Sequence, residues 1–143
     1  MKKKIAIVIG VTLIQFIRID KDHPTYEKSG DFLTVTKADK KTTNLIQSAC
    51  YDCHSYDTEY PWYTNISPVS LWIGHHIEEA REHLNFSTWA EYDSEKKEHK
   101  IEEMIEEFEE GEMPLESFTW THPEAKLSAD EKQLVLNWFK SIQ

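Results

Sequence analysis

The spacing of apolar residues constrains this chain most, because it fits helices and offers no pattern for a sheet. Apolar side chains recur three or four positions apart over residues 39–54, 69–85, 94–110 and 128–142. No stretch alternates between apolar and polar residues as a half-buried strand would. Gly111 is placed to end the third run, and Ser128 with Glu131 predicts a capping box at the start of the fourth. We therefore expect an all-α domain with about four helices and long loops.

The first 18 residues differ from the rest of the chain in composition. The basic stub Lys2–Lys4 precedes the apolar run Ile5–Ile17, which is the layout of a secretory signal. A helix over that run spans roughly 20 Å, less than a bilayer core of about 30 Å. Neither a small-residue cleavage site nor a cysteine for lipid attachment follows it. We expect a hydrophobic signal peptide or signal-anchor helix, with residues 5–17 as a candidate membrane tether.

This leader sets the expected domain organisation and location. Residues 1–18 form the signal or anchor, residues 19–38 a linker broken at His23-Pro24, and residues 39–143 the folded domain. Export places that domain in the periplasm, or anchors it in the inner membrane facing the periplasm.

The charge balance excludes one class of partner. The chain has 26 acidic and 16 basic residues, and four of the basic ones lie in the first 18 positions, where no acid occurs. The remainder therefore carries 12 bases against 26 acids, a net charge of −14. Binding nucleic acid requires clustered Lys and Arg to neutralise phosphates, so we expect no nucleic-acid partner.

The only two cysteines belong to a motif with a defined chemistry. Cys50 and Cys53 are separated by two residues, and His54 follows directly. C-x-x-C-H is the attachment signal of c-type haem. Each thiol adds to one vinyl group of the porphyrin to form a thioether, and the adjacent imidazole becomes the proximal ligand of the iron. We expect one covalent haem c per chain, with Cys50, Cys53 and His54 binding it.

Three other uses of the cysteines were weighed. A thioredoxin-like redox pair needs a βαβ setting, and no strand pattern is present. A zinc site needs two further ligands, for which His76 and His83 are the candidates, although their spacing is longer than structural zinc usually has. A disulfide across two residues would restrain the chain little.

Met113 is the leading candidate for the second axial ligand of the iron. A thioether is a soft ligand, and Pro114 stiffens the loop that presents it. Met1 is the initiator, and Met104 lies on an apolar helix face where methionine commonly fills the core. The rival ligands are His75 and His76, of which His76 is the stronger.

Several strings resemble one family. The chain is similar to the bacterial haem-binding domain family of exported proteins from about residue 40 to residue 142. The motifs that carry the resemblance are the Cys50–His54 motif, Tyr60-Pro-Trp-Tyr63, Ile66-Ser-Pro68, the helix of His76 and Arg81, Leu84-Asn-Phe-Ser-x-Trp89, Gly111-x-Met-Pro114 and His122. The order of motif helix, Met-Pro loop and closing helix also resembles a single-haem, class I-like cytochrome c. This resemblance implies a small cytochrome c-like fold, covalent haem and an electron-transfer or redox role.

The sequence therefore predicts an exported monohaem c-type cytochrome that transfers single electrons, and an electron carrier rather than an enzyme. A redox partner with a basic docking surface would suit residues 91–116, which hold twelve acids and three bases. Arg81 is a candidate partner for a haem propionate, and Pro61 or Pro68 for placing the carbonyl that accepts from His54 Nδ1–H. The alternatives are a haem-based sensor or ligand-binding module, and a peroxidase-like domain in which His76 is the acid–base residue.

Overall fold

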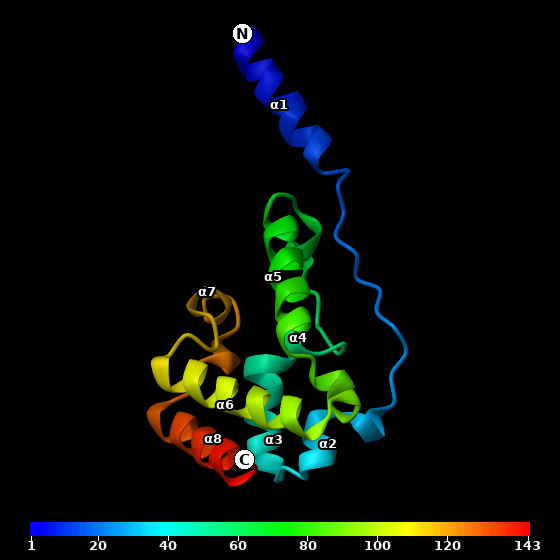
Figure 1. Cartoon of the computed structure of the whole chain (residues 1–143). Coiled ribbons are helices and arrows are strands. Elements are labelled where there is room, and N and C mark those ends of the chain that lie inside the picture. The colour runs from blue at the N-terminus through cyan, green and yellow to red at the C-terminus, as the bar shows by residue number, and fades with distance from the viewer.

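The computed structural model describes residues 1–143 and contains helices and loops but no strand (Figure 1). The α-helices are α1 (Lys2–Ile14), α2 (Phe32–Thr36), α3 (Lys40–Ile46), α4 (Asp52–His54), α5 (Val69–His83), α6 (Ser94–Glu110), α7 (Glu116–Thr119) and α8 (Ala129–Ser141). A π-helical segment, η2 (Gln47–Tyr51), lies between α3 and α4. Four 3₁₀ turns complete the structure: η1 (Lys28–Gly30), η3 (Trp62–Asn65), η4 (Phe86–Glu91) and η5 (Pro123–Ala125).

The longer helices begin and end at the residues that the sequence indicates. Asp39 caps α3 by accepting from the backbone N–H groups of Lys41 and Thr42. Gly111 ends α6 with φ +80°, a left-handed conformation that glycine adopts without the strain of a side chain. At the start of α8, Ser128 and Glu131 form the predicted capping box. Local polar groups therefore fix these boundaries.

The expected fold was wrong in the number of helices. About four were expected after the N-terminal helix, whereas that part of the chain has seven α-helices, α2 to α8. The predicted helix over residues 39–54 is present but consists of α3, η2 and α4 in succession. The helices that were missed within the body are α2, with five residues, and α7, with four. Such segments are too short to show a helical period, so tertiary packing decides them.

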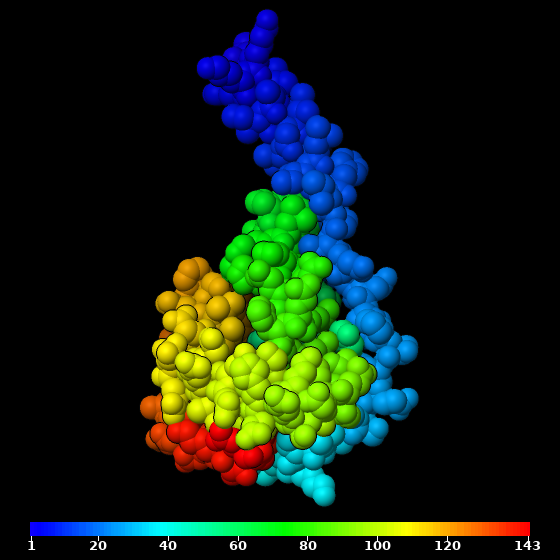
Figure 2. Space-filling view, in the orientation of Figure 1, coloured from blue at the N-terminus to red at the C-terminus, as the bar shows by residue number.

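The expected anchor helix also needs correction. Helix α1 has 13 residues, and no helix of the chain combines the length and apolar character that crossing a bilayer requires. None of the residues of α1 is buried. Figure 2 shows α1 projecting away from the helical body, so the hydrophobic core is built without it.

The segment expected to be an extended linker takes part in the fold. Within residues 19–38, residues 28–30 form η1 and residues 32–36 form α2. Asp31 caps α2, and Phe32 is fully buried. Its ring stacks on Phe86 with a centroid distance of 4.7 Å. The folded domain therefore begins before residue 39, because it needs this aromatic side chain in its core.

Residues 15–21 form a strap on the end of α5. Gln15 accepts from the Ser67 N–H at 3.1 Å and donates to the Ser67 carbonyl at 2.8 Å. Ser67 Oγ donates to the carbonyl of Ile17 at 3.1 Å. Ile19 packs on Gly74, where an added Cβ would lie only 2.6 Å from its Cγ2. The absence of a side chain at Gly74 therefore allows the strap to lie close to α5.

The core lies where α2, α3, α6 and α8 meet, at the lower end of the body in Figure 1. Phe32 contacts three other aromatic rings there, those of Phe86, Trp89 and Trp138. Helices α6 and α8 pack on each other through Phe108 and Phe139. Helix α5 stands on this core, and its C-terminal half packs against α4. The fold thereby fixes the Cys50–His54 motif between the core and α5.

A buried acid lies beside the core aromatics. Asp31 Oδ1 accepts from the Tyr51 hydroxyl at 2.8 Å and from the Leu33 N–H at 3.0 Å. Asp31 Oδ2 is buried and has no hydrogen-bond partner. Burial, which is the largest effect, raises the pKa of the Asp31 carboxyl above its usual value because a charge is poorly solvated there.

We expect Phe32→Ala to lower the free energy of unfolding by roughly 3–5 kcal/mol, as deletion of a buried ring usually does. The control Val35→Ala lies in the same helix at a side chain that is 41% exposed, and should change stability by about 0.5 kcal/mol or less. Urea denaturation measures both. Equal, small effects of the two variants would contradict the assignment of α2 to the core.

The raised pKa of Asp31 predicts a particular pH dependence. The folded protein keeps the carboxyl proton at pH values where the unfolded chain has lost it, so this group lowers the free energy of unfolding as pH rises above about 4. Asp31→Asn should therefore make stability rise more steeply with pH than in the wild type. Asp39 has a lowered pKa, chiefly through its bond from the Thr42 hydroxyl, so Asp39→Asn should flatten the same profile. Urea midpoints from pH 4 to pH 7 test this opposite behaviour.

Candidate functional site

The cysteines of the motif lie on a distorted helix. Cys50 is in the π-helical segment η2, and Cys53 is in α4. Isolated π-helical turns are frequent at functional sites, because they change the direction of side chains within a helix. Both thiols are free and half-buried. Burial raises the pKa of Cys50 to about 12 and that of Cys53 to about 11, so both sulfurs carry protons at neutral pH.

The His54 ring is held in one tautomer. Its Nδ1 lies 3.1 Å from the carbonyl oxygen of Leu84 and 3.2 Å from that of Ala80. Carbonyl oxygens only accept hydrogen bonds, so Nδ1 carries the proton and the lone pair is on Nε2. Burial, the largest effect, lowers the pKa of His54 and keeps the ring neutral. A neutral imidazole fixed through Nδ1, with no protein partner at Nε2, has the arrangement of a metal-ligating histidine.

The carbonyls that hold His54 are not those expected from the sequence. Pro61 or Pro68 was predicted to place the acceptor, whereas both acceptors lie at the end of α5. Leu84 has extended φ and ψ angles of −147° and 122°, which turn its carbonyl out of the helical ladder. The packing of α4 on α5 brings these carbonyls to His54, and no local motif signals that contact.

Hydrogen bonds fix the loop that follows the motif. The buried Ser55 hydroxyl donates to the carbonyl of Tyr51 at 2.7 Å. The Thr58 hydroxyl donates to the carbonyl of Asp52 at 2.6 Å. The Glu59 N–H donates to Asp52 Oδ1 at 2.9 Å. The loop is thereby folded back onto the end of α4.

Arg81 of α5 bonds this same loop. Its Nε donates to the carbonyl of Ser55 and its Nη2 to Thr58 Oγ1, each at 2.8 Å. The guanidinium carbon also lies 5.3 Å from the centroid of the Tyr56 ring. Arg81 was a candidate for a haem propionate, but its guanidinium is engaged by the chain itself.

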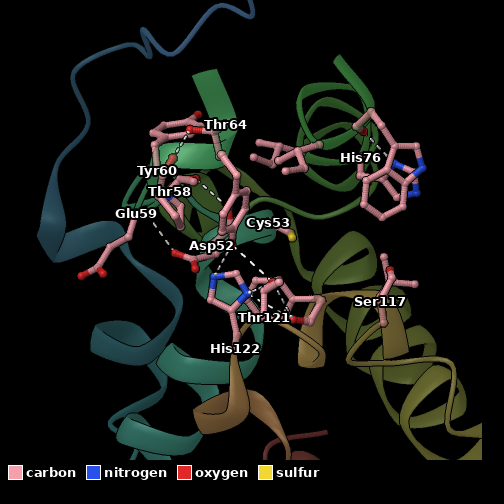
Figure 3. Close-up of a pocket in the computed structure, with 17 residues that line it drawn as sticks. Asp52, Cys53, Thr58, Glu59, Tyr60, Thr64, His76, Ser117, Thr121 and His122 are labelled. Atoms are coloured by element: carbon pink, nitrogen blue, oxygen red, sulfur yellow. Dashed lines mark hydrogen bonds between the residues drawn. The ribbon is translucent and has the colours of Figure 1, made fainter. Parts of the chain in front are cut away.

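A small cavity of about 70 Å³, open to solvent on one side, lies beside Cys53 (Figure 3). The segment of residues 58–64, helix α5 and the segment of residues 115–122 form its walls. Apolar side chains cover much of the wall: Pro61, Trp72, Ile73, Ile77, Leu115 and Phe118. The Cys53 thiol therefore lies against an apolar hollow, where the edge of an apolar group can contact it.

The structure brings some of the predicted site residues to this cavity and not others. Cys53 and His76 line it, from α4 and α5 respectively. Cys50, His54 and Met113 do not line it, and Cys50 packs against the core. Met113 is half-buried in the loop between α6 and α7, two residues before the lining residue Leu115.

The two histidines considered as rivals to Met113 differ in their surroundings. His75 is exposed, and its Nε2 lies 3.4 Å from Glu79. His76 Nδ1 lies 2.9 Å from the carbonyl oxygen of Trp72, and the ring centroids of the two residues are 4.3 Å apart. His76 Nε2 has no bond to the protein, so it is the nitrogen available to a molecule in the cavity.

The four aromatic residues Trp62, Trp72, Phe108 and Trp138 divide among three environments. Only Trp72 lines the cavity. Phe108 and Trp138 belong to the core, where they pack against α8 and Phe32. Trp62 is 73% exposed. Helical periodicity identifies the apolar face of a helix, but it does not distinguish a residue that packs in the core from one that lines a cavity.

Tyr63 and His122 form a polar pair in the cavity wall, and although both belong to the motifs of the family resemblance, their contact was not predicted. The Tyr63 hydroxyl lies 3.2 Å from His122 Nε2, and His122 Nδ1 lies 3.1 Å from the carbonyl of Phe118. The imidazole also stacks on the Phe118 ring with a centroid distance of 4.0 Å. The His122 ring is therefore fixed at both nitrogens, and its partner Tyr63 is 59 positions away.

No group of three or more His, Cys, Asp and Glu side chains is placed to hold one metal ion anywhere in the chain. The zinc interpretation of Cys50 and Cys53, which needed His76 and His83 as further ligands, therefore finds no support in this arrangement.

Comparison with known proteins decides between the remaining interpretations. A family model described as a haem-binding domain matches residues 9–141. The chain belongs to the haem-binding domain family. Haem is therefore the cofactor that this family implies, and the free thiols and the unbonded Nε2 of His54 fit it. Searches of curated proteins and of solved structures found no match.

Proposed function

We propose that this haem-binding protein carries one covalent haem c and transfers single electrons, as an exported monohaem c-type cytochrome. The observation that carries the proposal is the state of His54. Its Nδ1 proton is donated to the carbonyls of Leu84 and Ala80, which leaves the Nε2 lone pair for the proximal side of the iron. When bound, haem supplies an iron that changes its charge by one electron.

The two thiols support covalent attachment. Cys50 and Cys53 are one helical turn apart, neither is in a disulfide, and both are partly accessible. Addition of a thiol to a vinyl group forms one carbon–sulfur bond, and the thiol hydrogen goes to the other vinyl carbon, so no oxidant is needed. Two such bonds hold the cofactor beside His54 whatever the oxidation state of its iron.

Met113 is the proposed distal ligand, with His76 as its rival. Met113 lies in a loop whose following residues, Leu115 and Phe118, form part of the cavity wall. His76 already lines the cavity, which favours it as the alternative ligand. A methionine ligand raises the reduction potential relative to a pair of histidines, so the two assignments predict different redox properties.

Residues 91–116 support a partner with a basic docking surface. Four acids of α6, Glu102, Glu106, Glu109 and Glu110, lie together near the C-terminus of the chain, with only Lys140 among them as a positive charge. A field of one sign steers an oppositely charged partner and makes association dependent on salt. We propose a redox protein as that partner.

The N-terminal residues support export to the periplasm. Three lysines precede an apolar helix that contributes nothing to the core, as expected for a segment with a targeting role rather than a structural one.

A second function, a haem-based ligand-binding or peroxidase-like module, is favoured by one observation. His76 lines the cavity, and its Nε2 has no bond to the protein, so it is a candidate acid–base residue. This function requires an open distal position on the iron. Carbon monoxide should then bind to the reduced wild-type protein at once, whereas a protein with two strong axial ligands should resist it.

Covalent attachment is tested by expressing the full chain with c-type haem maturation machinery. We expect haem to remain with the wild-type polypeptide after acid–acetone extraction and to give a c-type pyridine haemochrome. The variant with both Cys50→Ser and Cys53→Ser should lose its haem to the solvent. Ser48→Ala, two positions before Cys50, serves as the control and should keep it. A colourless wild type with two free thiols would refute the proposal.

Met113→Ala tests the distal ligand. We expect the reduction potential to fall and carbon monoxide to bind the reduced variant readily, because the thioether that favours ferrous iron is lost. The matched control is Met104→Leu, since Met104 packs against the core and should leave both properties unchanged. If His76→Ala lets carbon monoxide bind the reduced protein readily and Met113→Ala does not, the ligand is His76.

A further inference from the structure

One turn of α5 contacts both the proposed proximal ligand and the residue that follows it. Ala80 and Leu84 provide the two carbonyls that accept from His54 Nδ1. Arg81, which lies between them, donates to the carbonyl of Ser55. Two consecutive residues of the motif segment are therefore held by the same helical turn.

The second bond of Arg81 extends this hold to the other side of His54. Arg81 Nη2 donates to Thr58 Oγ1, and the Thr58 hydroxyl donates in turn to the carbonyl of Asp52. The guanidinium is thus connected to Asp52 before Cys53 and His54, and to Ser55 after them. These bonds hold the backbone on both sides of Cys53 and His54 and involve neither side chain.

The hydrogen-bond partners of Arg81 show that it is not held by pairing with an acidic side chain. Its guanidinium takes part in no salt bridge, although the chain has 26 acidic residues. Its hydrogen bonds go to one backbone carbonyl and one hydroxyl, and its plane lies near the ring of Tyr56. A planar fork that bonds two acceptors at once fixes a distance and a direction, which a lysine cannot reproduce.

We propose that Arg81 is a positioning residue that holds His54 against the carbonyls of Ala80 and Leu84, and so sets how strongly the imidazole donates through Nε2. This inference rests on the proposed function. A well-formed Nδ1–H···O bond makes the ring a stronger donor and favours the more positive state of a bound metal. Loosening the bond should therefore raise the reduction potential.

The test uses full-length, haem-loaded protein and three single substitutions. Arg81→Lys keeps the charge but loses the fork. Thr58→Val removes one acceptor at nearly constant shape, and Thr58→Ser is its matched control because it keeps the hydroxyl. We expect a higher potential in Arg81→Lys and Thr58→Val, the wild-type potential in Thr58→Ser, and less than the summed shift in Arg81→Lys combined with Thr58→Val.

A second measurement follows the proton itself. In the reduced protein, NMR should show the His54 Nδ1 proton exchanging with water roughly tenfold faster in Arg81→Lys, as expected for the loss of about one ordinary hydrogen bond. Thr58→Val should act in the same direction, and Thr58→Ser should not.

The outcomes separate the inference from the function on which it rests. If Arg81→Lys lowers stability to urea but leaves the potential and the proton exchange at their wild-type values, Arg81 is structural only and the inference is overturned. If the wild type carries no covalent haem, the proposed function fails, and the exchange rate of the His54 proton in the haem-free chain still decides the role of Arg81.

Discussion

The contact between α4 and the C-terminal end of α5 is the interaction on which the rest of the site depends. It gives His54 its acceptors, at 3.1 and 3.2 Å, and determines which ring nitrogen holds the proton. The same contact places Arg81 on the loop after the motif and brings Ile77 to the cavity beside Cys53. Without this contact the Cys50–His54 motif would be a short helical end with an unoriented imidazole.

Two apolar regions adjoin the contact between α4 and α5, namely the hydrophobic core and the cavity beside Cys53. On one side the aromatic rings of Phe32, Phe86 and Trp89 close the core and exclude water. On the other side the walls around Cys53 remain open and are completed by polar groups such as Tyr63 and His122. A closed core gives rigidity, and the open hollow leaves the Cys53 thiol partly accessible. The motif lies at the boundary of the two, with Cys50 toward the core and Cys53 toward the cavity.

The sequence predicted those features that are set within a few residues. Gly111 and Ser128 fix helix ends through neighbouring backbone groups, and the structure confirms both. The motif likewise lies within five consecutive residues, and the family match supports haem as its cofactor.

Features that depend on distant contacts could not be predicted in this way. The acceptors of His54 are 26 and 30 positions away, and the hydrogen bonds of Arg81 span 26 and 23 positions. The sequence predicts a linker where α2 lies because five residues show no period, although Phe32 is needed in the core. Periodicity identifies buried faces but not their partners.

The strap of residues 15–21 limits how far a protease could shorten the N-terminus without removing contacts of the folded body. A cut before Gln15 would remove α1 and leave the bonds to Ser67 and the contact of Ile19 with Gly74 intact. A cut beyond Ile19 would uncover the side of α5 around Gly74 and release the loop that leads into that helix. Any shortening of the N-terminus beyond Ile19 would therefore also affect helix α5, which forms one wall of the cavity.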